Sequence, residues 1–234
     1  MRKELVVKLN EFYNTFGIVP DESFNCPKME ECNKKGIKLA QGMQCHVGSK
    51  YGEKGVPKVM VVSLDCGDGG IETIVNRTNT IEGLINKNKI NPHMRGTIDC
   101  ISDVLKFENK KDSLKYYVMT NSCKCSREVG QTDQLPEFFY EQCAEYKINE
   151  IDLVKPDIIY LQGRRALIGL KFENIEGLSV QISEYLKYLV IGDKKYYAVQ
   201  CIHPSARGRH AQRKKMFYNE IMPEINRLLT EKLG

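Results

Sequence analysis

Four short apolar runs, separated by longer amphipathic segments, constrain the fold of this chain most. They are residues 58–63 (KVMVVS), 116–119 (YYVM), 157–161 (DIIYL) and 197–202 (YAVQCI). Continuous apolar runs of this length are typical of parallel strands buried on both faces. Their alternation with helical patterns predicts an α/β fold: a three-layer α/β/α sandwich with a central, mostly parallel four-stranded sheet. A length of 234 residues suits one domain spanning 1–234.

The segments between these runs predict the remaining elements. Helices are expected over residues 1–14, part of 71–90, 98–107, 137–153 and 209–232, with a loop at 91–97 and a hairpin around 192–193. Residues 21–57 show little periodicity and contain Cys26, Cys32 and Cys45. An irregular segment this long inside a domain needs an organiser, which a bound metal would supply.

Each predicted strand is followed closely by a polar or conformationally special residue. Asp65 follows the first strand, Asn121 the second, Gln162 with Gly163 the third, and His203 the fourth. In parallel sheets ligands bind beyond the carboxyl ends of the strands, so these groups predict an active site at that edge. Polar residues are common at strand ends in general, which limits the specificity of the pattern.

The cysteine content favours metal ligation over disulfides. No apolar run approaches the roughly 20 residues that span a bilayer, and the N-terminal residues predict an amphipathic helix rather than a signal peptide. We therefore expect a cytoplasmic protein without membrane contact, in which nine cysteines do not form a disulfide framework. The alternative for each cysteine is a buried free thiol.

Positive charge is concentrated near the C-terminus. The net charge is +5, and residues 203–218 contain five arginines and lysines without an acid. A basic stretch of this kind indicates either a polyanion-binding face or a solvated helix start.

Four motifs occur in an order that resembles the uracil-DNA glycosylase superfamily, most closely its branch carrying a [4Fe-4S] cluster. They are SLDCGDGG (63–70), TNSCKC (120–125), Cys143 followed by KINEIDLVKPDIIYLQGRRAL (147–167), and HPSARG (203–208). The resemblance implies a monofunctional DNA glycosylase that flips a uracil or modified pyrimidine out of DNA and hydrolyses its glycosidic bond. The product would be an abasic site, made in DNA repair or in defence against modified foreign DNA by a protein we expect to be monomeric.

The resemblance also implies a set of cluster ligands. Its ligand positions correspond to Cys26, Cys32, Cys125 and Cys143, which suit a [4Fe-4S] cluster or, as the alternative, zinc. The family spaces its first pair two residues apart, whereas five residues intervene here, so Cys45 or Cys123 could replace one of the four.

Three residues receive catalytic or base-reading roles from the resemblance. Asp65 would activate the attacking water or, alternatively, cap a glycine-rich turn. His203 would donate a hydrogen bond to the departing base, the alternative being a histidine packed at a strand end. Asn121 would read the flipped base, the alternative being a structural turn. Leu64 stands where the cluster-bearing branch has an acid, which is the main departure from its pattern.

The predicted pocket wall suits a bulkier base than uracil. Residues 91–97 contain His93 and Met94 but no Phe or Tyr, and the base-binding set would be Leu64, Cys66, Gly67, His93 and Asn121. Phosphate or groove contacts are expected from Arg164, Ser205, Arg207, Arg209, Arg213 and Lys214. Two other classes remain open: a catalytically inactive DNA- or protein-binding module that retains the cluster, and an iron-sulfur redox sensor.

Overall fold

The computed structural model describes residues 1–234 except 21–24, 38, 41–42, 65–72, 128–134, 234 and the side chains of Ala40, Ser126, Arg127 and Arg209. Its helices are α1 (Arg2–Thr15), α2 (Met29–Asn33), α3 (Ile74–Glu82), α4 (Pro92–Leu105), α5 (Glu137–Gln142), α6 (Ala144–Val154), α7 (Val180–Ser183), α8 (Ala211–Met216) and α9 (Met222–Leu233). Its strands are β1 (Leu39–Ala40), β2 (His46–Val47), β3 (Val59–Ser63), β4 (Tyr117–Asn121), β5 (Ser126–Arg127), β6 (Ile158–Gln162), β7 (Lys171–Asn174), β8 (Leu186–Ile191) and β9 (Lys194–Cys201). Within these residues, no helix is both long and apolar enough to span a bilayer.

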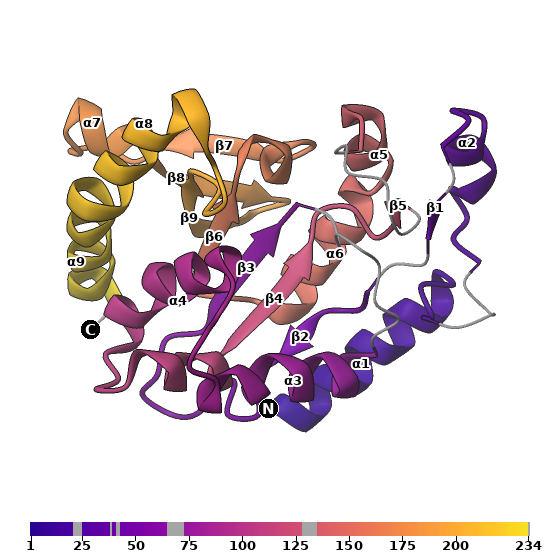
Figure 1. Ribbon diagram of the computed structural model, residues 1–234, viewed down its shortest axis with the longest axis horizontal. Helices are drawn as coiled ribbons and strands as arrows, with labels where there is room; N and C mark the ends of the chain where they lie inside the picture. Colours follow the sequence, from indigo (N-terminus) through magenta and orange to yellow (C-terminus); the bar gives the residue numbers. More distant parts are fainter. Residues whose placement is uncertain (21–24, 38, 41–42, 65–72, 128–134, 234) are drawn as a thin grey trace.

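The main sheet is mixed and has seven strands in the order β2-β4-β3-β6-β9-β8-β7. The four predicted strands form its parallel centre, β4-β3-β6-β9 (Figure 1). The prediction of a four-stranded sheet was incomplete, because β2, β8 and β7 extend it with antiparallel pairs. β7 was missed since its sequence, KFEN, is mostly polar and exposed, as suits an edge strand.

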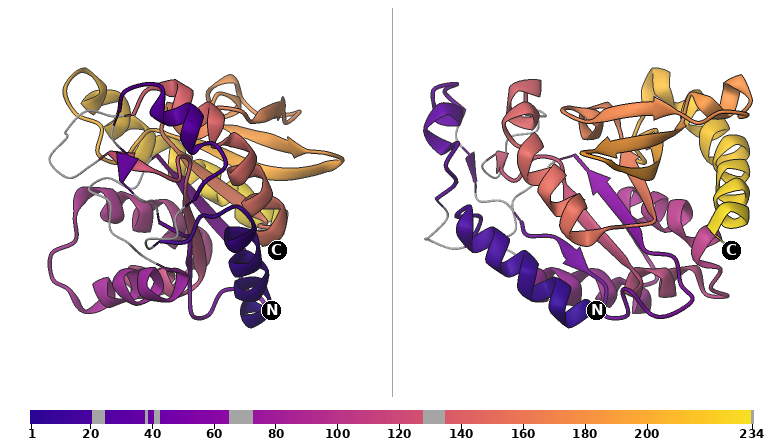
Figure 2. Two further views of the ribbon diagram at one scale, coloured as in Figure 1. Left: turned by 90° about the vertical axis from the view of Figure 1, so that its right-hand side faces the viewer. Right: turned by 180° about the vertical axis from the view of Figure 1, so that it is seen from behind.

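Helices cover both faces of the sheet. Alternate residues of β3 point to opposite sides, Met60 and Val62 into one core and Val59 and Val61 into the other. The first core contains apolar residues of α1 and α6, and the second contains those of α4 and α9. Figure 2 shows α6 crossing one side of the strands in the view from behind. Strands β3, β4 and β6 are buried at every position, which explains their largely apolar sequences.

Two helix boundaries differ from the sequence prediction. Residues 92–97 were predicted as a loop but form the first turns of α4, because the Asn91 side chain accepts a hydrogen bond from the Met94 amide and Pro92 occupies the first turn. The predicted helix over 137–153 is two helices, α5 and α6, which meet at Cys143.

The C-terminal half confirms the predicted hairpin and long final helix. β8 and β9 pair around Gly192, whose φ is +60°. Strand β9 provides both the hairpin arm and the fourth parallel strand. The final helix runs through α8 and α9 with a π-helical turn at Phe217–Ile221 between them.

Candidate functional site

Side chains at the carboxyl ends of the four parallel strands lie in one row. Ser63 at the end of β3 is the register partner of Asn121 at the end of β4, and Gln162 at the end of β6 pairs with Cys201 of β9. The Ser63 hydroxyl donates to Gln162 Oε1 at 2.9 Å and so joins the middle strands. The row contains the predicted Asn121. The predicted His203 lies two residues after Cys201, the member of the row on β9.

The row is extended beyond the sheet by Leu64 and His203. Gly163 follows Gln162 with φ +92°, and a Cβ built on it would lie 3.2 Å from the His203 Cβ and 3.4 Å from the Leu64 Cδ2. Leu64 and His203 therefore lie on the two sides of Gly163. A glycine at this position permits both the backbone conformation and this close approach. Asp65, Cys66 and Gly67 lie outside the described residues.

The turn that follows β9 fixes the tautomer of His203. The Ser205 amide donates to His203 Nδ1 at 3.2 Å. A ring nitrogen that accepts a hydrogen bond carries no proton, so in the neutral imidazole the proton is on Nε2. His203 therefore presents an N–H donor on the side of the ring away from Ser205.

His93 from the first turn of α4 packs on His203. The two imidazole rings stack with centroids 5.3 Å apart and planes 15° apart. His93 Nε2 lies 3.0 Å from Gln162 Oε1 and 3.1 Å from Ser63 Oγ. The amide oxygen only accepts, so His93 Nε2 is the donor. Burial lowers the pKa of His93 below its ordinary 6.5, which keeps the ring neutral near pH 7.

Asn121 is buried and held by an arginine that neither the motifs nor the strand pattern singled out. Arg77 of α3 is 3% exposed and donates from Nη2 to Asn121 Oδ1 at 2.5 Å. Its Nη1 donates to the Gln44 carbonyl oxygen, also at 2.5 Å. Because a guanidinium has no acceptor, the Asn121 oxygen must face Arg77 and the NH₂ group must point elsewhere. Arg77 thus orients the amide that was predicted to read a base.

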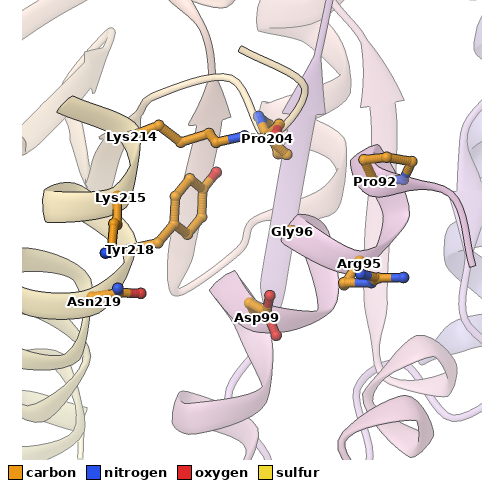
Figure 3. Close-up of a pocket in the computed structure, with 9 residues that line it drawn as sticks. All are labelled: Pro92, Arg95, Gly96, Asp99, Pro204, Lys214, Lys215, Tyr218 and Asn219. Carbon is orange, nitrogen blue, oxygen red and sulfur yellow. Dashed lines mark hydrogen bonds between the residues drawn. The ribbon is translucent and has the colours of Figure 1, made fainter. Parts of the chain in front are cut away.

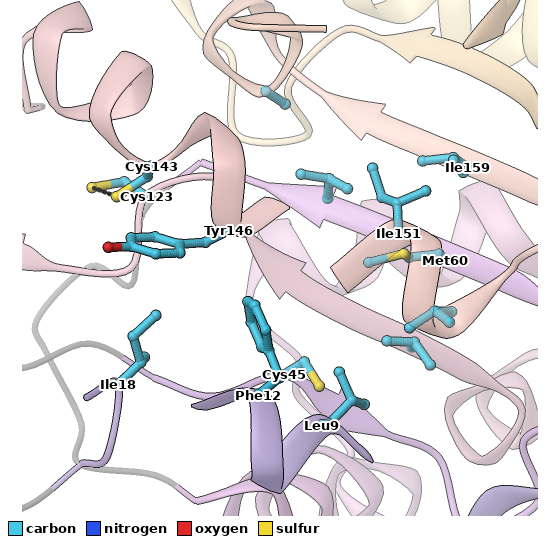
Figure 4. Packing of buried hydrophobic residues seen from close by; sticks show 14 of the residues in the cluster. Leu9, Phe12, Ile18, Cys45, Met60, Cys123, Cys143, Tyr146, Ile151 and Ile159 are labelled. Carbon is cyan, nitrogen blue, oxygen red and sulfur yellow. Dashed lines mark hydrogen bonds between the residues drawn. The ribbon is translucent and has the colours of Figure 1, made fainter. Parts of the chain in front are cut away.

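Cys143 is the centre of a group of buried thiols beside Tyr146 (Figure 4). Its Sγ lies 3.9 Å from the Sγ of Cys123, and it accepts from the Lys124 amide at 3.4 Å. The contact with Cys123 lowers the pKa of Cys143 below its ordinary value, assisted by the Lys124 amide and two lysine charges against the opposing effect of burial. Of the two thiols, Cys143 is therefore the one that ionises more readily.

The predicted N-terminal ligands, Cys26 and Cys32, lie close enough to Cys143 for its charge to raise their pKa. Burial raises the pKa of Cys32 to about 11, and the charges of Cys143 and Cys26 add to the rise. Cys26 Sγ lies 3.3 Å from the Tyr146 hydroxyl. Cys125 is also buried and acts on the neighbouring Cys123. The structure thus gathers the regions of all four predicted ligands, although they are distant in sequence.

Among the described residues, no three Cys, His, Asp or Glu side chains lie close enough together to hold one metal ion. Buried cysteines are the donor set of both an iron-sulfur cluster and a structural zinc site. Cys45 is buried beside Tyr13, whose hydroxyl binds the Cys45 amide at 3.0 Å.

The predicted DNA contacts differ in exposure and in their partners. Arg207 is exposed, and Arg164 is 86% exposed and forms an ion pair with Glu137 at 3.4 Å. Arg213 forms an ion pair with Glu184, and Lys214 donates to the Pro204 carbonyl oxygen at 3.1 Å. Ser205 is half-buried in the turn after His203.

Comparison with known proteins adds no family. No protein-family model matches this chain, and no curated protein matches it either. Its function is therefore inferred from the side chains at the strand ends and from the motifs that carry them.

Proposed function

We propose that this protein is a monofunctional DNA glycosylase that removes uracil or a modified pyrimidine from DNA and leaves an abasic site. The observation that carries the proposal is the tautomer of His203, which presents an Nε2–H donor at the same sheet edge as Asn121. Base excision by hydrolysis needs a donor of this kind, because negative charge develops on a carbonyl oxygen of the departing base.

His203 is suited to that task by its neutral state. A neutral donor is pre-oriented by the Ser205 amide and by the stacked His93 ring, so it need not reorganise as charge develops. The turn that contains it, residues 203–205, would enter the DNA and stabilise the flipped nucleotide. Flipping costs a few kcal/mol, which contacts between this turn and the duplex would offset.

Asn121 would recognise the flipped base through its NH₂ group. Arg77 occupies one side of the amide oxygen, so the amide acts chiefly as a donor toward a base carbonyl. Asp65 keeps its proposed role as the carboxylate that orients the attacking water. Water rather than a lysine is the nucleophile, which is why the product is an abasic site.

The substrate we favour is a 5-substituted or otherwise modified pyrimidine. The ring of His93 already stacks on His203 and binds Gln162, so it is committed to those partners instead of a base. Met94 is buried and Leu64 is half-buried at the strand end, and residues 91–97 contain no Phe or Tyr. A wall without a large aromatic ring leaves room for a 5-substituent.

A [4Fe-4S] cluster is the cofactor we propose, held by Cys26, Cys32, Cys125 and Cys143 with Cys123 as the neighbouring thiol. Thiolate-bound iron at this position would cross-link the N-terminal segment to the chain between β4 and α6. The cysteines lie on the first core and not in the row of strand ends, so this role is structural.

The experiment that tests the proposal is a substrate panel. Duplexes and single strands carrying uracil, mismatched thymine or bulky 5-modified cytosines are incubated with the protein, and released bases are identified by mass spectrometry. Release of a modified pyrimidine, lost in Asp65→Asn with DNA binding retained, is the expected result. Release of uracil alone would contradict the substrate class. Binding of every DNA without release would instead indicate the inactive DNA-binding module, which the apolar Leu64 favours.

A further inference from the structure

A cavity of about 320 Å³ lies beside the 203–205 turn, between the first half of α4 and the α8 segment (Figure 3). Cavities that bind small molecules begin at about this size. Arg95 and Asp99 contribute from α4, and Lys215 contributes from α8. The remaining lining residues are Pro92, Gly96, Pro204, Lys214, Tyr218 and Asn219.

Within the described residues, the cations around this cavity form no ion pair, unlike a neighbouring arginine. In the part of the chain that the structure describes, no carboxylate lies within 4.0 Å of the charged nitrogens of Arg95, Lys214 or Lys215. By contrast, Arg213 of the same helix is paired with Glu184. Asp99 is the one acid of the lining, and burial raises its pKa. The cavity therefore has a surplus of positive charge available to an anion.

The walls of the cavity are tied to the turn that follows His203. Lys214 donates to the Pro204 carbonyl oxygen at 3.1 Å, and the Tyr218 hydroxyl donates to the Ile202 carbonyl oxygen at 2.7 Å. On the opposite wall, a Cβ built on Gly96 would lie 2.4 Å from the Pro204 Cβ, so α4 approaches the turn closely. Pro204 thus separates the cavity from the stacked His93 and His203.

We propose that this cavity binds a backbone phosphate of the DNA strand, on the far side of the Pro204 turn from the target base. The assignment rests on the proposed function, since it takes DNA as the anion. Arg95 would approach the phosphate from α4 and Lys215 from α8, while Lys214 would bridge the phosphate and the turn. A phosphate held on both walls would fix the position of the 203–205 turn relative to the strand it enters.

The test is the salt dependence of binding to a duplex that contains no target base. Each lost phosphate contact lowers the slope of log K against log salt by about 1. Arg95→Gln and Lys215→Gln should each produce this decrease, and the double variant should lose about 2. Lys215→Arg should retain the wild-type slope. The matched control is Arg227→Gln, in which an exposed arginine paired with Glu224 and Glu231 is removed and the slope should not change.

The outcomes separate this inference from the glycosylase proposal. Wild-type binding with unchanged slopes in Arg95→Gln and Lys215→Gln would overturn the phosphate site while leaving the glycosylase proposal standing. Absence of wild-type binding to any DNA would overturn both. Both substituted side chains are exposed, so urea unfolding midpoints close to wild type are expected and would show that lost binding is not lost folding.

Discussion

The imidazoles of His93 and His203 stack at 5.3 Å with planes 15° apart, which joins the first turn of α4 to the turn after β9. Each ring is oriented by its own hydrogen bond, His93 by Gln162 and His203 by the Ser205 amide. The pair couples two segments 110 residues apart in sequence. Two stacked rings that are both neutral avoid the repulsion that two imidazoliums would suffer.

Removing one ring should therefore misplace the other. His93→Ala is expected to lower the excision rate by about 10- to 100-fold, because a misplaced donor loses catalytic effect steeply with distance. His93→Phe keeps a stacking ring without the bond to Gln162 and should retain more activity than His93→Ala. Single-turnover kinetics measure both. Equal, wild-type rates in the two variants would show that His93 does not position His203.

His46 should make the fold sensitive to acid. Its Nε2 donates to the Leu114 carbonyl oxygen at 3.0 Å, its buried Nδ1 has no hydrogen-bond partner among the described residues, and burial lowers its pKa from 6.5 to about 3. Between these values the unfolded chain binds a proton that the folded chain does not, so stability decreases as the pH falls. The slope is about 1.4 kcal/mol per pH unit. Urea unfolding from pH 7 to pH 4 measures it.

The control for this prediction is His46→Gln, which retains a side-chain donor and does not titrate. The variant should be less stable than wild type at pH 7 and should lose the contribution of His46 to the slope. An unchanged slope in His46→Gln would assign the acid sensitivity to other groups.

Loss of the Arg77 side chain should lower both the stability of the fold and the rate of base excision. Arg77→Met removes the donors to Asn121 Oδ1 and to the Gln44 carbonyl oxygen, both of which are buried. Each lost hydrogen bond to a buried group costs about 1–3 kcal/mol of the free energy of unfolding. Excision should fall as well, because Asn121 loses the hydrogen bond that orients its amide. Arg95→Met, an exposed arginine on the neighbouring α4, is the control for stability, measured by urea unfolding.

The cluster assignment predicts a colour that depends on particular cysteines. Anaerobically purified protein should absorb broadly near about 400 nm through thiolate-bound iron. Cys143→Ala should lose this band, because Cys143 is one of the four proposed cluster ligands and its pKa is lowered toward the thiolate that binds iron. Cys100→Ala, a buried cysteine in the second core, should keep it. A colourless wild-type protein, or a band that survives Cys143→Ala, would contradict the assignment.

The parallel centre of the sheet could be predicted from sequence because each of its strands contains a short run of mostly apolar residues. Strands β2 and β7 contain no apolar run of this kind, because β2 has only two residues and β7 is mostly polar, and both lie at the edges of the sheet. The start of α4 was predictable in principle, since Asn91 followed by Pro92 is a helix-capping signal. It was missed because apolar periodicity begins only at Ile98.

The site was predicted in part. Asn121 and His203 were found because parallel strands bring their carboxyl ends to one edge, a consequence of topology alone. Arg77 was not predicted. Its partner Asn121 is 44 residues away, and an arginine on an amphipathic helix is usually solvated. The ring stack of His93 on His203 likewise depends on how α4 packs, which local sequence does not specify.

The most direct test of the central proposal is single-turnover base excision by wild type, Asn121→Ala and His203→Ala on a 5-modified pyrimidine duplex, alongside binding of abasic product DNA. We predict release of the free base by wild type and a loss of about 10²- to 10³-fold in His203→Ala, with a clear loss in Asn121→Ala. Product binding should be unchanged in both variants. Excision that is equally fast in His203→Ala, or no excision of any pyrimidine by wild type, would contradict the account.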